Sequence, residues 1–186
     1  MARTMKLLAL LTVSGTIVFS VLFAVTGNKA LYSWAISLGT TAYHFVMRLG
    51  VGLIYNSLMK NRADYHKSWY RVRSWEKKLY KAIKVKKWKD RMPTFNSDFF
   101  DISKHSWDEI AQAGCQAELV HETIVVLSFM PVICSVWFGE LAVFLITSVI
   151  AALIDLLFVI MQRYNRPRLI RMTEMKNKRS KQEGDK

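Results

Sequence analysis

The chain has 186 residues, of which 52% are hydrophobic, yet its formal net charge is +13. This apolar content excludes a disordered chain, and only two cysteines exclude a disulfide scaffold. Residues 7–25 contain no charged side chain, and that run is long enough to cross a bilayer. Because basic stretches alternate with membrane-length apolar runs, the composition argues against a soluble nucleic-acid-binding protein and indicates a small integral membrane protein.

Four segments are expected to cross the membrane, namely residues 7–25, 31–57, 119–138 and 141–161. The first exceeds the apolar core of a signal peptide, about 7–15 residues, and lacks a good cleavage site, so an uncleaved span is favoured. The second is less apolar and contains His44 and Arg48. The predicted fold is all-α, an integral membrane protein with four transmembrane helices. They form an N-terminal hairpin within residues 1–58 and a C-terminal hairpin within residues 106–170.

The basic residues predict the orientation. Residues 57–117 and 163–186 hold 23 of the 27 lysines and arginines, whereas the turn at Gly139 and Glu140 holds none. Since lysine and arginine are enriched on the cytoplasmic side, both termini and the middle segment, residues 59–105, are expected in the cytoplasm of a multi-pass cell-membrane protein. Residues 171–186 are expected to form a basic disordered tail.

The middle segment has the pattern of an amphipathic helix. Apolar residues recur at three- and four-residue steps at Trp69, Val72, Trp75, Leu79 and Ile83, with lysines on the other faces. This predicts a basic helix that lies among anionic headgroups and ends before Pro93. Each basic residue adds about 1 kcal/mol of attraction to such a surface. The helix is either only an anchor, or it also places Trp88, Lys89 and Asp90 at a polar site.

A capping box at Ser106 and Glu109 predicts a helix that starts there and continues into the third span. Glu118 and His121 lie three residues apart on this helix, on one face and near the inner membrane boundary. A carboxylate beside an imidazole can orient a general base. The alternative is an interfacial histidine and an ordinary surface glutamate.

The fourth span ends in a run of polar residues, QRYNRPR at 162–168. Arginine binds phosphate and carboxylate oxygens through paired hydrogen bonds, and the alternative is a stop-transfer cluster. Because the turn before this span is short, Glu118, His121 and residues 163–168 are expected at the same depth. A base and an anion-binding cluster in one plane suggest group transfer to or from a lipid.

Ionisable residues also occur inside the expected bilayer, where such groups are usually paired and functional. Arg48 and Asp155 are the expected pair, with His44 one turn from Arg48, and their role is either functional or a structural bridge between helices. Cys115 is either an acyl-carrying nucleophile or plain packing. Four scattered histidines form no ligand-spaced cluster, so no metal is expected. No nucleic-acid partner is expected either.

Three strings carry a resemblance to a known family. KKWKDRMP at 86–93, AELVH at 117–121 and QRYNRPRL at 162–169 resemble the glycosyl-4,4'-diaponeurosporenoate acyltransferase family, over roughly residues 69–170. The resemblance implies a bacterial membrane enzyme that moves a fatty acyl group from a thioester of coenzyme A or acyl carrier protein to a hydroxyl of a lipid or glycolipid, without a bound cofactor. The matching site positions are Trp88, Lys89, Asp90, Glu118, His121, Gln162, Arg163, Asn165, Arg166 and Arg168.

These positions suggest a mechanistic hypothesis. His121, oriented by Glu118, removes the acceptor proton, and Asn165 or an arginine stabilises the oxyanion. The arginines of 163–168, with Lys86 and Lys89, hold donor phosphates. Gln116 stands where the family commonly has arginine and Glu122 where it commonly has tryptophan, so a carotenoid glycoside acceptor is not implied. The alternatives are a non-enzymatic lipid-binding or accessory protein and another lipid-modifying transferase, such as a methyltransferase.

Overall fold

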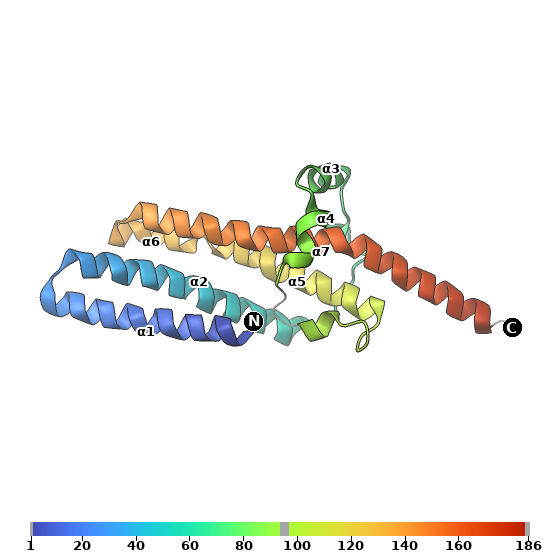
Figure 1. The fold of residues 1–186 in the computed structure, drawn as a ribbon, viewed down its shortest axis with the longest axis horizontal. Coiled ribbons are helices and arrows are strands. Elements are labelled where there is room, and N and C mark those ends of the chain that lie inside the picture. Colours follow the sequence, from blue (N-terminus) through green and yellow to red (C-terminus); the bar gives the residue numbers. More distant parts are fainter. Residues whose placement is uncertain (1, 94–96, 185–186) are drawn as a thin grey trace. The chain divides into compact units, whose positions relative to one another are not determined.

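The computed structural model describes residues 2–93 and 97–184, and within these ranges the chain is helical without a strand. The predicted all-α class is confirmed. The helices are α1 (Ala2–Thr26), α2 (Lys29–Met59), α3 (Ser74–Ala82), α4 (Val85–Trp88), α5 (Trp107–Leu127), α6 (Met130–Phe138) and α7 (Leu141–Gly184), with short 3-10 turns at Ser68–Tyr70, Lys89–Arg91 and Ser97–Phe100 (Figure 1). The chain divides into two compact units.

Unit 1 comprises Met1–Ile54 and Glu122–Leu156. In it α1 and α2 form an antiparallel hairpin (Figure 1) that turns at Gly27, where φ is +66°. Small residues allow the two helices to approach closely. A Cβ added at Gly15 would lie 3.0 Å from Leu38 Cδ1, and one added at Gly39 would lie 3.3 Å from Thr16 Cγ2. The hairpin is therefore packed through its glycines.

Three helical stretches in the described part of the chain are long and apolar enough to cross a membrane, namely Arg3–Thr26, Trp107–Phe138 and Leu141–Glu183. They contain three of the four expected spans. The remaining one, residues 31–57, is helical within α2 but is not among these stretches. Its glycines and polar residues, including His44 and Arg48, lower its hydropathy. The structure thus supports a membrane protein with three clear candidate spans where four were expected.

Unit 2 comprises Tyr55–His121 and Leu157–Lys186, and its helix α5 begins as predicted. The Glu109 N–H donates to Ser106 Oγ at 3.2 Å, and the Ser106 N–H donates to Glu109 Oε2 at 2.8 Å. This reciprocal pair satisfies two N–H groups that the first helical turn leaves unbonded. The expected third span is not one unbroken helix, because α5 ends at Leu127 and α6 begins at Met130, next to Pro131.

The amphipathic segment is not the single helix that was expected to reach Pro93. It breaks after α3, where Lys84 adopts a left-handed conformation with φ +53°. The reversal brings Val85 into the interior, where its side chain is fully buried. Burying the Val85 side chain is favourable, whereas another turn of a lysine-rich helix would bury little apolar surface. The chain therefore gains more from the break than from continuing the helix.

The expected disordered tail is also wrong over most of its length, since α7 continues to Gly184. Lysine, arginine, glutamate, glutamine and methionine are favourable in helices, and they make up most of residues 171–183. Glu174 and Lys178 have the spacing of a stabilising pair. Residues 185–186 of the tail and residues 94–96 of the basic segment lie outside the described residues.

Candidate functional site

An arginine near the middle of α7 joins two buried carboxylates in unit 2. Arg163 Nε donates to Glu76 Oε2 at 2.8 Å, and its Nη2 donates to Glu76 Oε1 at 2.9 Å. Its Nη1 donates to Glu118 Oε1 at 2.7 Å. Arg166, which is 2% exposed, pairs with Glu118 Oε2. α3, α5 and α7 are therefore connected by one ion network, whose four members are largely or fully buried.

The same two arginines also hold the chain that precedes α3. Arg163 donates to the carbonyls of Trp69 and Arg71, both at 3.2 Å. Arg166 donates to the Tyr70 carbonyl at 2.8 Å, and its guanidinium lies 4.8 Å from the centre of the Tyr70 ring. Backbone carbonyls thus accept hydrogen bonds from both guanidinium groups, and an aromatic face contacts that of Arg166. Residues 69–71 are thus hydrogen-bonded to α7 through arginine side chains that lie more than ninety residues later in the chain.

Glu76 was not singled out from the sequence, although it completes the network. Burial alone opposes its charged form, but hydrogen bonds from Arg163, Tyr80 and the Arg73 backbone together lower the pKa of Glu76 to about 2. The Tyr80 hydroxyl donates to Glu76 Oε2 at 2.6 Å, and this burial and bonding raise the pKa of Tyr80. The sequence did contain one indication that Glu76 is special, because it is the only acidic residue between Tyr65 and Lys89.

This network changes the reading of three predicted site residues. Arg163 and Arg166 were expected to bind substrate, but their charges are balanced by Glu76 and Glu118 within the protein. Glu118 was expected to orient His121, and the structure shows its carboxylate oxygens in contact with the two arginines. A fully buried carboxylate is stable only with such partners, and two arginines satisfy it better than one imidazole.

His121 has a different neighbour on α7. Its ring stacks on Phe158, with the ring centres 4.6 Å apart and the planes 8° apart. The imidazole is only partly buried, so a reactant can approach it. Stacking on Phe158 therefore restrains the plane of the His121 ring.

Gln162 and Cys115 are both buried in the same unit. Gln162 faces α5, where its Oε1 would lie 3.3 Å from a Cβ added at Gly114. Cys115 is a free thiol with no exposed surface. Both side chains therefore lie in the packing between α5 and α7, and neither is open to a substrate.

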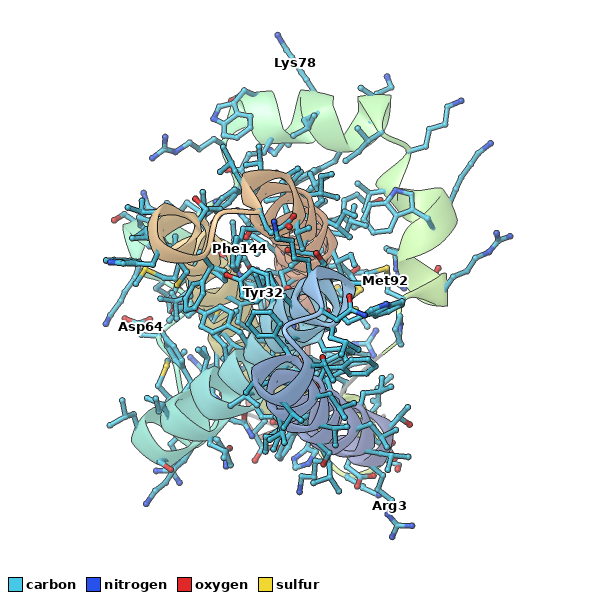
Figure 2. All side chains as sticks on the ribbon, turned by 90° about the vertical axis from the view of Figure 1, so that its left-hand side faces the viewer. Arg3, Tyr32, Asp64, Lys78, Met92 and Phe144 are labelled. Atoms are coloured by element: carbon cyan, nitrogen blue, oxygen red, sulfur yellow. The ribbon has the colours of Figure 1, made fainter. Side chains whose placement is uncertain are left out.

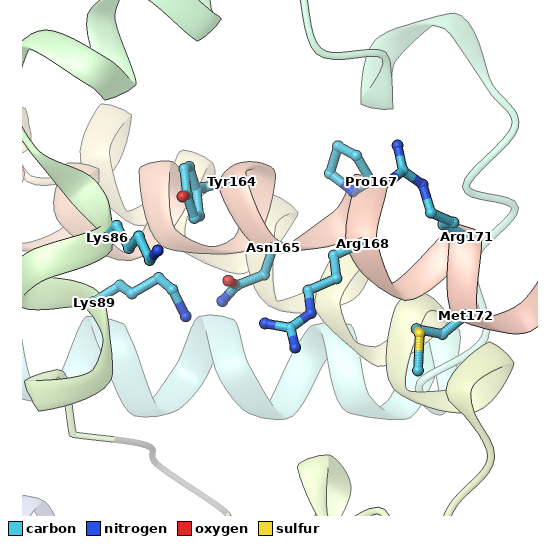
Figure 3. Close-up of a pocket in the computed structure, with 8 residues that line it drawn as sticks. All are labelled: Lys86, Lys89, Tyr164, Asn165, Pro167, Arg168, Arg171 and Met172. Carbon is cyan, nitrogen blue, oxygen red and sulfur yellow. The ribbon is translucent and has the colours of Figure 1, made fainter.

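A basic cavity of about 500 Å³ lies on another side of α7. Lys86 and Lys89 approach it from α4 and the turn after it, and Asn165 and Arg168 approach it from α7 (Figure 3). Lys89, Asn165 and Arg168 are predicted site positions, and Lys86 was expected to bind donor phosphates with them. The structure brings these four residues together. Lys89 also pairs with Asp90 at 2.7 Å, whereas the Trp88 indole donates to the Ile83 carbonyl at 3.0 Å and supports the turn.

Unit 1 contains the ionisable residues that were expected inside the membrane. The expected pair is present, since Arg48 Nε donates to Asp155 Oδ2 at 3.0 Å, and Arg48 Nη2 donates to the Ala151 carbonyl at 3.2 Å. His44 is 5% exposed, and within the described residues neither of its ring nitrogens has a hydrogen-bond partner. Arg48 and Asp155 therefore connect α2 with α7 inside this unit.

Within residues 2–93 and 97–184, no three histidine, cysteine, aspartate or glutamate side chains are grouped so that they could hold a metal ion. The search of curated proteins and the search of solved structures returned no match. The sequence model of the glycosyl-4,4'-diaponeurosporenoate acyltransferase family matches residues 66–175. This range covers more than half of the chain and includes Glu76, Glu118, His121 and the basic cavity. The chain belongs to the glycosyl-4,4'-diaponeurosporenoate acyltransferase family.

Proposed function

We propose that the protein moves a fatty acyl group from an acyl thioester to a hydroxyl of a lipid or glycolipid at the cytoplasmic face of a bacterial cell membrane. The observation that carries this proposal is the family match over residues 66–175. The matched range contains a partly exposed histidine and a separate basic cavity within one compact unit. Acyl transfer needs a base for the acceptor and a site for the donor, and these two features supply them.

His121 is the proposed general base. It takes the proton of the acceptor hydroxyl while the oxygen attacks the thioester carbonyl and forms the new C–O bond. The C–S bond of the tetrahedral intermediate then breaks, and the proton passes from His121 to the departing sulfur. Stacking on Phe158 restrains the ring during both proton transfers. Since Arg163 and Arg166 are engaged by carboxylates, Asn165 and Arg168 are the remaining candidates to stabilise the oxyanion.

The proposed topology has four spans with both termini in the cytoplasm. α2 has 31 residues, or roughly 46 Å, which exceeds the bilayer core of about 30 Å. Arg48, the charged residue within the expected span, is neutralised by Asp155, which lowers the cost of placing it in lipid. The segments outside the spans carry most of the basic residues, in agreement with the positive-inside rule.

A deletion strain tests the function. Lipid extracts of the strain, complemented with the wild-type gene or with an empty vector, should differ in one lipid class that carries an additional fatty acyl group only when the gene is present. The mass difference between the two lipids would identify the acyl chain, and the mass of the lipid without that chain would identify the acceptor. Unchanged lipids, with the protein expressed and located in the membrane, would refute an acyltransferase and favour the accessory alternative.

Anionic headgroups are the proposed partners of α3. Glu76 and Tyr80 face the ion network, whereas Trp75, Leu79 and Ile83 lie exposed on the adjoining face, Trp75 by 58% of its surface. Lysines cover other faces of α3, and Figure 2 shows one of them, Lys78, pointing away from the helix. Tryptophan and lysine together are typical of an interfacial helix.

A pair of spin labels tests this placement. A nitroxide on Leu79→Cys should be more accessible to oxygen than to an aqueous nickel complex. One on Lys81→Cys, about 200° around the helix, should show the reverse. Both native cysteines are at least partly buried, which favours labelling at the introduced site. Equal accessibility at the two positions, in bilayers that contain anionic lipid, would contradict the interfacial placement.

A further inference from the structure

The arginines of α7 separate into two groups according to their partners. Arg163 and Arg166 have their charges balanced by Glu76 and Glu118. Arg168 and Arg171 line the basic cavity and are exposed. Across the described residues, no carboxylate pairs with either of them, nor with Lys86, which lines the same cavity. Neutralised arginines hold the fold together, and the others remain available to a ligand.

The lining of the cavity favours a polyvalent anion. Four of its eight residues are lysine or arginine and none is acidic. Among the described residues, the carboxylate that pairs with a lining cation is that of exposed Asp90, on Lys89. Figure 3 shows the Lys86, Lys89, Asn165 and Arg168 side chains extending along one side of α7, with Arg171 on another. Like charges gathered in one cavity repel each other until an anion binds. Guanidinium and ammonium groups with a side-chain amide are suitable donors for phosphate oxygens.

A second cavity of about 460 Å³ adjoins the first and shares Lys86, Tyr164 and Pro167 with it. Its lining includes apolar Val72 and Val85 and the ring of Tyr80, together with several lysines. The shared residues make the two cavities neighbouring parts of one surface. A ligand that fits both has phosphate at one end and a flat or apolar group at the other.

We propose that Lys86 and Arg168, together with Lys89, form a binding site for a phosphate ester carried by one of the substrates. The nature of the ligand rests on the proposed acyl transfer, whose reactants carry such esters in two places. One is the phosphates of a coenzyme A thioester, and the other is the phosphate of a lipid headgroup. Both present the same oxygens to the cavity, but the first arrives from water and the second from the bilayer.

Binding to the full-length protein distinguishes the two sources without relying on catalysis. The protein is reconstituted in nanodiscs of phosphatidylcholine and titrated with coenzyme A by calorimetry, and the retention of added phosphatidylglycerol is measured by mass spectrometry in parallel. Arg168→Gln and Lys86→Gln remove lining charges. Arg179→Gln, on an exposed turn of α7 away from both cavities, removes the same charge elsewhere.

A charge-assisted hydrogen bond contributes enough that Arg168→Gln should weaken the correct ligand about 10- to 100-fold. Lys86→Gln should weaken it in the same direction, and Arg179→Gln less than about threefold. Weakened coenzyme A binding identifies the donor, and weakened phosphatidylglycerol retention alone identifies a headgroup. The proposal is overturned if folded Arg168→Gln and Lys86→Gln bind both ligands as the wild type does. Because no acyl transfer is measured, this outcome is independent of the deletion experiment.

Discussion

Replacement of Glu118 by alanine is expected to lower the free energy of unfolding by about 3–5 kcal/mol, the cost of breaking a buried ion pair by removing one partner. The change leaves Arg166 charged, 2% exposed and without its carboxylate. It also removes one of the two carboxylates that Arg163 contacts. The apparent unfolding midpoint in detergent should fall by about 10 °C.

Two variants establish the cause of that loss. Glu174→Ala removes a carboxylate from an exposed position on α7 and should leave the midpoint within about 2 °C of the wild type. Glu118→Leu combined with Arg166→Met removes both charges and should recover much of the stability that Glu118→Ala loses. If Glu118→Ala and Glu174→Ala unfold at the same temperature, the network does not support the fold.

Replacement of His121 by alanine is expected to lower kcat for acyl transfer about 10²- to 10⁴-fold, the usual contribution of a general base. The KM for the donor should change little, because the proposed phosphate site contains none of the residues that contact His121. Purified enzyme, a radiolabelled acyl thioester and the acceptor identified by lipidomics provide the measurement. The unfolding midpoint of the variant should stay near that of the wild type.

His66→Ala is the matched control, because His66 is exposed in the same unit and lies outside the proposed site. It should retain at least half of the wild-type rate. Full activity of a folded His121→Ala enzyme would assign the proton transfer to another group. Loss of activity in both variants would indicate damage unrelated to the base.

Several features followed from the sequence because they depend on neighbours in the chain. The capping box of Ser106 and Glu109 is a local exchange of hydrogen bonds, so three residues of spacing were enough to predict it. The all-α class followed from apolar runs of membrane length. Arg48 and Asp155 could be paired in advance because an isolated charge inside a bilayer has few alternatives.

Other features depended on contacts between distant segments. The break at Lys84 is decided by the burial of Val85, which local helix propensity does not include. The tail was expected to be disordered because its composition is basic and polar, yet favourable helix formers extend α7 to Gly184. Charge alone therefore did not distinguish a solvated helix from a disordered segment.

The net charge of +13 and the apolar runs were enough to indicate a membrane protein, and the strings at 86–93, 117–121 and 162–169 were enough to indicate its family. Only the tertiary structure decided which arginines pair with buried carboxylates and which line the cavity. Arg163, Arg166 and Arg168 are equivalent in a sequence pattern. Glu76, which lies 87 residues before Arg163, and Glu118 neutralise the first two, and Arg168 is left facing the cavity. The physical reason is that a buried charge requires a counter-charge, and folding alone determines which residues meet.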